Sequence, residues 1–259
     1  MIGVFSSGVG GITVVKALKD ALPEYDVIYL GDTARTPYGN KSLAAISTFT
    51  LQGIDFLLQK GAKLLIIASN AAAGAIAGDM TEQQKAPWLE IITPAVQQAL
   101  KASRHSRIGI IGTRATIACK IYEQKIRALD PQAKVYSYEG SLLVPLVEEG
   151  WLKKPETVRI VKKSIYPLKV RQIDTLILGC THFGSLKEIF KRKMGPNICI
   201  IDPTVTVVGT IKTFLRCNPE VDAQLGKTGR TRFFVSDISE HFQKTAQTFF
   251  GGHIQLDRM

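Results

Sequence analysis

Two strand ends in this chain carry side chains that could transfer protons or groups. In "LILGCTHFGS", residues 176–185, an apolar run ends in a small residue and then in Cys180, Thr181 and His182. A thiolate is favoured beside a histidine or a helix N-terminus, so this spacing indicates a reactive cysteine. In "LIIASNAAAG", residues 65–74, the same pattern ends in Ser69 and Asn70. One strand end therefore carries a thiol where the other carries a hydroxyl.

Two loops have the composition of binding segments. The loop "SSGVGG", residues 6–11, follows an apolar run and opens an amphipathic segment, so its backbone N–H groups could hold a carboxylate. The loop "GDTARTPYGNKS", residues 31–42, is long and polar, and Tyr38 is placed there to line a pocket between Pro37 and Gly39. A tight turn and an ordinary surface loop stay open as the alternative interpretations.

Several catalytic and metal-binding motifs are absent from the sequence. It contains neither the G-x-x-x-x-G-K-[ST] loop of nucleotide-binding proteins nor the G-x-S-x-G elbow of serine hydrolases. No pair of histidines has the spacing of a zinc site. The four cysteines are far apart and form no C-x-x-C motif. We therefore expect no disulfide framework and no metal.

The elements that must position these residues follow a βαβ rhythm. Short apolar runs alternate with amphipathic segments, which predicts parallel sheets covered by helices. The second half of the chain resembles the first, since "LLIIASN" corresponds to "LILGCTH". The sequence thus predicts an α/β protein of two related halves, whose equivalent strand ends face each other across one cleft. The expected strands lie within residues 1–5, 26–32, 63–69, 106–116, 133–140, 173–183, 197–203 and 231–237.

Composition limits the class of protein. The chain has 259 residues, enough for one large domain or two of about 100–150 residues. Its formal net charge is +11, but the basic residues are spread over amphipathic segments without interleaved aromatic residues, which does not indicate a nucleic-acid module. The N-terminus lacks the pattern of a signal peptide, and no apolar run reaches the roughly 18–20 residues of a membrane span. We expect a cytoplasmic protein without a membrane partner.

Six motifs, taken in order, resemble bacterial glutamate racemases of the aspartate/glutamate racemase family. They are "IGVFSSGVGGITVVKAL", "YLGDTARTPYGNKS", "LLIIASNAAA", "IGIIGTRAT", "PLVEEG" and "LILGCTHF". The resemblance covers nearly the whole chain. It implies two flavodoxin-like domains with the site between them, the second inserted into the first. The expected first domain is 1–95 plus 208–259, and the expected inserted domain is 96–207.

The resemblance also implies a reaction, the conversion of L-glutamate to D-glutamate for peptidoglycan without a cofactor. In the family, one cysteine from each domain faces the substrate α-carbon, and the two move protons on opposite sides. The second cysteine corresponds to Cys180, with His182 as the group that assists it and Glu149 as a further acidic catalytic residue of that side. The expected substrate-binding positions are Ser7, Pro37, Tyr38, Gly39, Asn70, Ala71, Thr116 and Thr181.

This chain departs from the family pattern on one side of the site. The family has F-D-S-G where this chain has Ser6 as the second residue, so the aspartate that assists the first cysteine is missing. The family has A-C-N-T-A where this chain has Ser69 for the cysteine and Ala71 for a substrate-binding threonine. A serine hydroxyl ionises far less readily than a thiol of pKa about 8.5. The lost threonine hydroxyl is worth about 0.5–1.5 kcal/mol in hydrogen bonding.

Three functions are open at this point. The first is a glutamate racemase whose activity is strongly reduced or one-sided. The second is an inactive family member that binds an amino acid or a protein partner such as DNA gyrase. The third is a related racemase or lyase with another acidic or small substrate. A homodimer and binding to nucleic acid or gyrase are hypotheses from the family and from the basic charge, not from a motif.

Overall fold

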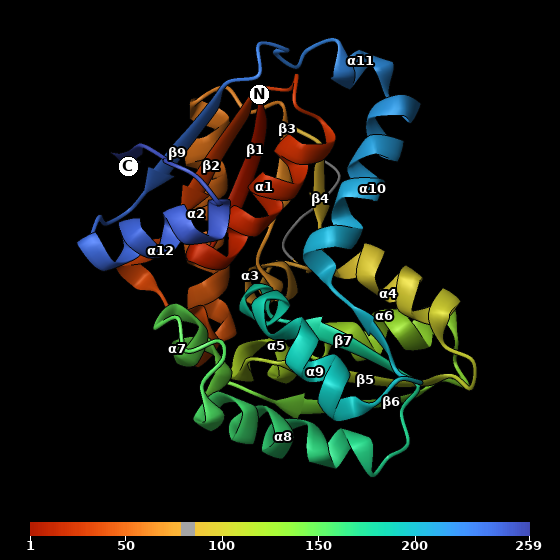
Figure 1. Ribbon diagram of the computed structural model, residues 1–259. Coiled ribbons are helices and arrows are strands. Elements are labelled where there is room, and N and C mark those ends of the chain that lie inside the picture. The colour runs from red at the N-terminus through yellow and green to blue at the C-terminus, as the bar shows by residue number, and fades with distance from the viewer. Residues whose placement is uncertain (79–85) are drawn as a thin grey trace.

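The computed structural model describes residues 1–78 and 86–259, whose strands form two parallel sheets (Figure 1). The first sheet has the strand order β10 (Leu256–Arg258), β9 (Thr231–Val235), β2 (Val27–Gly31), β1 (Ile2–Ser6), β3 (Leu64–Ile67) and β4 (Trp88–Glu90). The second has the order β6 (Lys134–Glu139), β5 (Arg107–Gly112), β7 (Thr175–Gly179) and β8 (Cys199–Ile201). All neighbouring strands are parallel. The predicted α/β class with two parallel sheets is confirmed.

Helices cover both sheets. Those of the first half of the chain are α1 (Ile12–Ala21), α2 (Leu43–Gln59), α3 (Asn70–Ala75) and α4 (Ile92–Ala102). The middle of the chain forms α5 (Arg114–Ala118), α6 (Ile121–Leu129), α7 (Leu143–Glu148), α8 (Pro155–Lys169) and α9 (Lys187–Met194). The last part forms α10 (Pro203–Cys217), α11 (Pro219–Asp222) and α12 (Glu240–Phe250). Short 3₁₀ turns are η1 (Val9–Gly11), η2 (Thr33–Arg35), η3 (Tyr38–Asn40) and η4 (Thr181–Leu186).

The residue pattern explains the central strands and the helices on them. Every residue of β1, β3 and β7 is buried, which is why these strands are continuous apolar runs rather than alternating ones. Helix α1 buries Ile12, Val15 and Leu18, which are spaced three residues apart and so share one face. Ser42 is the N-cap of α2, because its hydroxyl accepts a hydrogen bond from the backbone N–H of Ala45.

The C-terminal segment returns to the first sheet. Strand β9 pairs with β2, and β10 pairs with β9, so both ends of the chain build the same sheet. The expected boundaries at 95/96 and 207/208 each fall inside a helix, α4 and α10. Helix α4 contacts β7 and β8 of the second sheet as well as α10. The two helices thus join the halves, and the domain boundaries themselves stay predictions.

The two halves share part of their hydrophobic core. One cluster contains Phe5 and Ile67 from the first sheet together with Ile108 and Ile177 from the second. Each half also has a cluster of its own. Burial of apolar side chains is the main stabilising contribution in folding, so the shared cluster ties the two sheets together.

The folding of both halves brings their strand ends together. Strand β1 ends at Ser6, β3 leads into Ser69, β5 into Thr113 and β7 into Cys180. These are all carboxyl ends of parallel strands, where α/β proteins form their binding crevices.

Candidate active site

A pocket of about 910 Å³ lies where the strand ends meet. Most of the expected site residues line it, from both halves of the chain. They are Ser7, Pro37, Tyr38, Gly39, Ser69, Asn70, Ala71, Thr116, Cys180, Thr181 and His182. Two expected residues, Ser6 and Glu149, are not among its lining residues.

One wall of the pocket carries a thiol, an imidazole and a carboxylate in series. Cys180 lies at the end of β7, and its Sγ is 3.6 Å from Nδ1 of His182. The other ring nitrogen, Nε2, is 3.1 Å from Oε1 of Glu148 at the end of α7. Burial lowers the pKa of His182, but the hydrogen bonds with Cys180 and Glu148 outweigh burial and raise it to about 10. A protonated imidazole beside sulfur stabilises a thiolate, the form that can accept a proton from carbon.

The carboxylate of this series is not the expected one. Glu149 was predicted as the acidic residue of this side, but its side chain is exposed and its neighbour Glu148 contacts His182. Glu149 follows the last residue of α7, whereas Glu148 is still in the helix. Successive helix residues point about 100° apart, so only one of two adjacent glutamates can face the histidine.

The opposite wall carries the hydroxyls of Ser7 and Ser69. Ser69 follows β3 and caps α3, its Oγ accepting a hydrogen bond from the backbone N–H of Ala72 at 3.4 Å. The same Oγ lies 3.3 Å from Oγ of Ser7. The hydrogen-bond partners of the Ser69 hydroxyl are thus a backbone amide and another hydroxyl. Neither of these is a base that could remove its proton.

Ser6 lies below this wall, outside the pocket. It is buried at the end of β1, and its Oγ accepts a weak hydrogen bond from the N–H of Gly8 at 3.5 Å. A hydroxyl at this position is not a base that could take a proton from a neighbouring group. Ala71 also lines the pocket without a hydroxyl. Positions 6, 69 and 71 on the first-sheet side thus carry two hydroxyls and a methyl group, and no thiol or carboxylate.

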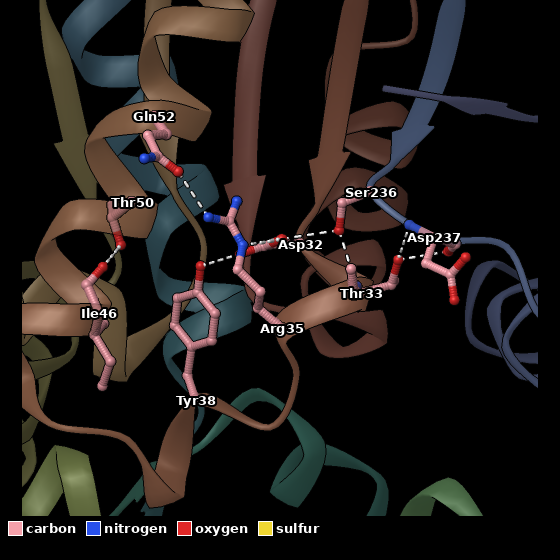
Figure 2. A network of polar contacts seen from close by, with 10 residues as sticks. Asp32, Thr33, Arg35, Tyr38, Ile46, Thr50, Gln52, Ser236 and Asp237 are labelled. Carbon is pink, nitrogen blue, oxygen red and sulfur yellow. Dashed lines mark hydrogen bonds and ion pairs between the residues drawn. The ribbon is translucent and has the colours of Figure 1, made fainter.

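The polar loop after β2 is held by a partly buried network of polar contacts (Figure 2). The hydroxyl of Tyr38 donates to Oδ2 of Asp32 at 2.5 Å, and Nε of Arg35 is 2.7 Å from the same oxygen. Ser236, beyond β9, donates to Oδ1 of Asp32 at 2.8 Å. Burial, together with the hydrogen bond to Asp32, raises the pKa of Tyr38 far above its ordinary value. The Tyr38 side chain therefore stays uncharged and lines the pocket in a fixed orientation.

Two glycines allow the loops of the two halves to approach each other. A Cβ at Gly10 would lie 2.1 Å from Oγ1 of Thr181, and a Cβ at Gly39 would lie 2.8 Å from Cβ of Thr113. A side chain at either position would meet the opposite half. The glycines of the "SSGVGG" and "PYG" segments thus serve close contact between the walls of the site.

Three residues at or behind the pocket wall were not predicted from the sequence: Glu148, which lines the pocket, and Asp32 and Tyr122, which contact Tyr38 and Asn70. To identify Glu148 one must know which side of α7 faces the site. The six residues of this helix are too few for the sequence pattern to show that. Asp32 had a signal, because it stands at a strand end as Cys180 does. Tyr122, on α6, donates a hydrogen bond to Asn70 and had no signal in the chain.

Known racemases are similar to this chain in sequence. A family model described as Asp/Glu/Hydantoin racemase matches residues 11–211. The chain belongs to this racemase family. It is 38% identical over 254 residues to a glutamate racemase of Syntrophus aciditrophicus, covering 96% of this chain and 92% of the relative. It is 40% identical over 252 residues to a glutamate racemase of Neisseria meningitidis, again covering 96% and 92%.

Solved racemase structures have the same fold. A glutamate racemase isoform of Bacillus anthracis superposes with a TM-score of 0.93 at 32% identity, covering 100% of this chain and 97% of that one. A glutamate racemase of Francisella tularensis, solved with D-glutamate, gives 0.91 at 33% identity, covering 100% and 96%. The recognised family and fold are therefore confirmed, and the main interpretation, a glutamate-racemase-type protein, is supported over the alternative of a binding protein.

Within 1–78 and 86–259, no helix is both long and apolar enough to cross a membrane. In the same residues, no group of three or more His, Cys, Asp or Glu side chains is arranged to hold a metal ion.

Proposed function

We propose that this protein acts on glutamate as a one-base member of the racemase family. Cys180 exchanges the α-proton of the glutamate enantiomer whose α-proton faces its sulfur. Conversion of one enantiomer into the other is strongly reduced. One observation carries the proposal. The pocket has a thiol–imidazole–carboxylate series on one wall, and hydroxyls on the other where the family has its first cysteine.

The chemistry of one wall is sufficient for exchange. The thiolate of Cys180 accepts the α-proton, and the carbanion then takes a proton back from the same thiol. His182 places a positive charge beside the sulfur of Cys180, and the carboxylate of Glu148 lies on the far side of the imidazole. This arrangement of charges favours the thiolate. Because the thiol exchanges its proton with solvent, the substrate acquires solvent hydrogen with unchanged configuration.

Inversion needs a proton donor on the opposite face. Ser69 is at that face, but a hydroxyl has a pKa far above that of a thiol and has no base beside it to assist. A water molecule or Ser69 would have to deliver this proton. We therefore expect inversion to be much slower than exchange.

The substrate contacts follow from the same pocket. Ser7, Asn70, Thr116 and Thr181 supply hydrogen-bonding groups, and Tyr38 and Ala71 complete the wall. These roles are carried over from the family motifs, as are the peptidoglycan role and the lack of a cofactor. A homodimer and a nucleic-acid or gyrase partner stay predictions, as does a cytoplasmic location.

Proton exchange in D₂O tests the proposal. Purified protein is incubated separately with L-glutamate and D-glutamate, and NMR follows loss of the α-proton while chiral chromatography follows inversion. We expect exchange of one enantiomer to exceed its inversion, and Cys180→Ala to abolish the exchange. Cys217→Ala is the matched control, since Cys217 is exposed and outside the pocket. Absence of exchange with both enantiomers would contradict the proposal.

A further inference from the structure

We propose that Tyr122 is a positioning residue for substrate binding, which orients the side-chain amide of Asn70 so that its N–H groups serve a carboxylate in the pocket. This inference rests on the proposed function, because it names a residue that acts through a substrate-binding group of the same site. Tyr122 does not line the pocket itself.

The contact joins the two halves of the molecule. Tyr122 lies in the first turn of α6, and Asn70 is the first residue of α3. The tyrosine hydroxyl is 2.5 Å from Oδ1 of Asn70, and both residues are at most 3% exposed. Burial raises the pKa of Tyr122 well above its ordinary value, so the hydroxyl keeps its proton and donates it.

This hydrogen bond decides which end of the amide is left free. A side-chain amide has one acceptor oxygen and one donor nitrogen, and Tyr122 takes the oxygen. In the described residues, Nδ2 of Asn70 is the one buried side-chain nitrogen or oxygen without a hydrogen-bond partner. A buried donor without a partner costs free energy, which a ligand that accepts its hydrogen bond would recover.

The free donor belongs to a residue of the pocket wall. Asn70 lines the pocket next to Ser69 and Ala71, on the wall that lacks the first thiol. The complementary ligand is an acceptor that carries negative charge, and a carboxylate of glutamate has this chemistry. Without the tyrosine, the amide could rotate and present Oδ1 to that carboxylate, which would repel it.

The test compares two tyrosine variants. Tyr122→Phe removes only the hydroxyl, and Tyr166→Phe is the matched control because Tyr166 is 63% exposed on α8. Isothermal titration with L-glutamate and D-glutamate gives Kd, and exchange in D₂O at varied glutamate gives the half-saturating concentration and the maximal rate. We expect Tyr122→Phe to raise Kd and the half-saturating concentration about tenfold, and to change the maximal rate little. Tyr166→Phe should match the wild type in both.

A second variant separates positioning from folding. Asn70→Asp keeps an acceptor for Tyr122 but replaces the free donor by an acceptor, so we expect it to bind glutamate more weakly than Tyr122→Phe. Thermal unfolding without ligand reports any purely structural effect. Glutamate binding by Tyr122→Phe with the wild-type Kd would overturn this inference alone. Failure of the wild type to bind either enantiomer would overturn the proposed function and this inference together.

Discussion

At the scale of single residues, Cys180 and Ser69 have equivalent positions and different neighbours. Cys180 has an imidazole at 3.6 Å, which is backed by a carboxylate. Ser69 has a backbone amide and the hydroxyl of Ser7. The first set of neighbours can hold a charge on the reacting atom and the second can only orient it. The difference between the two walls is therefore one of proton chemistry, not of placement.

Because the fold raises the pKa of His182, we expect the free energy of unfolding to depend on pH. Its pKa is raised from 6.5 to about 10, so the folded protein binds this proton more tightly than the unfolded chain. The resulting stabilisation is fully present below pH 6.5 and is lost as pH rises to about 10. Each pKa unit corresponds to about 1.4 kcal/mol. We expect the difference in unfolding free energy between wild type and His182→Asn, measured in urea, to shrink over this pH range.

A surface histidine serves as the control for that measurement. His241 is exposed on α12, and His241→Asn should follow the wild type at every pH. A stability difference for His182→Asn that stays constant from pH 6 to pH 10 would show that the imidazole is not held protonated in the fold.

At the scale of elements, the turns η1 and η4 set how closely the two walls of the site approach. Gly10→Ala would place a Cβ 2.1 Å from Oγ1 of Thr181. Overpacking of this kind costs about 1–3 kcal/mol, and here it would also push the walls apart. We expect lower stability in urea and slower α-proton exchange.

A glycine within a helix provides the matched control. A Cβ at Gly209, in α10, meets no atom within 4 Å, and this residue is exposed. Alanine is favoured over glycine in helices by about 0.5–1 kcal/mol, so Gly209→Ala should stabilise the protein and leave exchange unchanged. Equal stability and exchange for Gly10→Ala and the wild type would refute the role given to the contact.

The elements also show how far the sequence predicts the fold. The apolar runs at 26–32 and 63–69 became β2 and β3 because central parallel strands must be apolar on both faces. Strands β4 and β10 were not expected, because their three residues include charged ones and form no apolar run. They are held by pairing with β3 and β9, which is a tertiary effect.

The site residues likewise divide into those that the sequence predicts and those that it does not. Cys180, His182 and Ser69 follow from motifs at strand ends, because topology brings such ends together. Glu148 and Tyr122 do not follow, since one depends on the phase of a short helix and the other on contact between the two halves. Contacts between distant segments are set by packing, which a single sequence does not display.

At the scale of the whole molecule, the shared core predicts cooperative unfolding. One hydrophobic cluster contains Phe5 and Ile67 from the first sheet and Ile108 and Ile177 from the second. Unfolding of either sheet would therefore expose apolar surface of the other. The chain has two tryptophans, Trp88 in β4 and Trp151 in the second half.

These tryptophans allow each half to be followed separately. Trp88→Phe leaves a fluorescent probe in the second half, and Trp151→Phe leaves one in the first. We expect the fluorescence midpoint in urea to coincide with the circular dichroism midpoint of the same variant, in both variants. A fluorescence transition that precedes the circular dichroism transition in either variant would mean that the halves unfold independently.

Under the proposed function, this chain has the racemase architecture with one of its two bases missing. The most direct measurement is the rate of glutamate inversion, by chiral chromatography, in the wild type and in Ser6→Asp/Ser69→Cys/Ala71→Thr. These changes restore the family residues on the first wall. We expect the triple variant to invert both enantiomers much faster than the wild type, and the same variant with Cys180→Ala to lose inversion again. A wild type that inverts glutamate as fast as the triple variant would contradict the account.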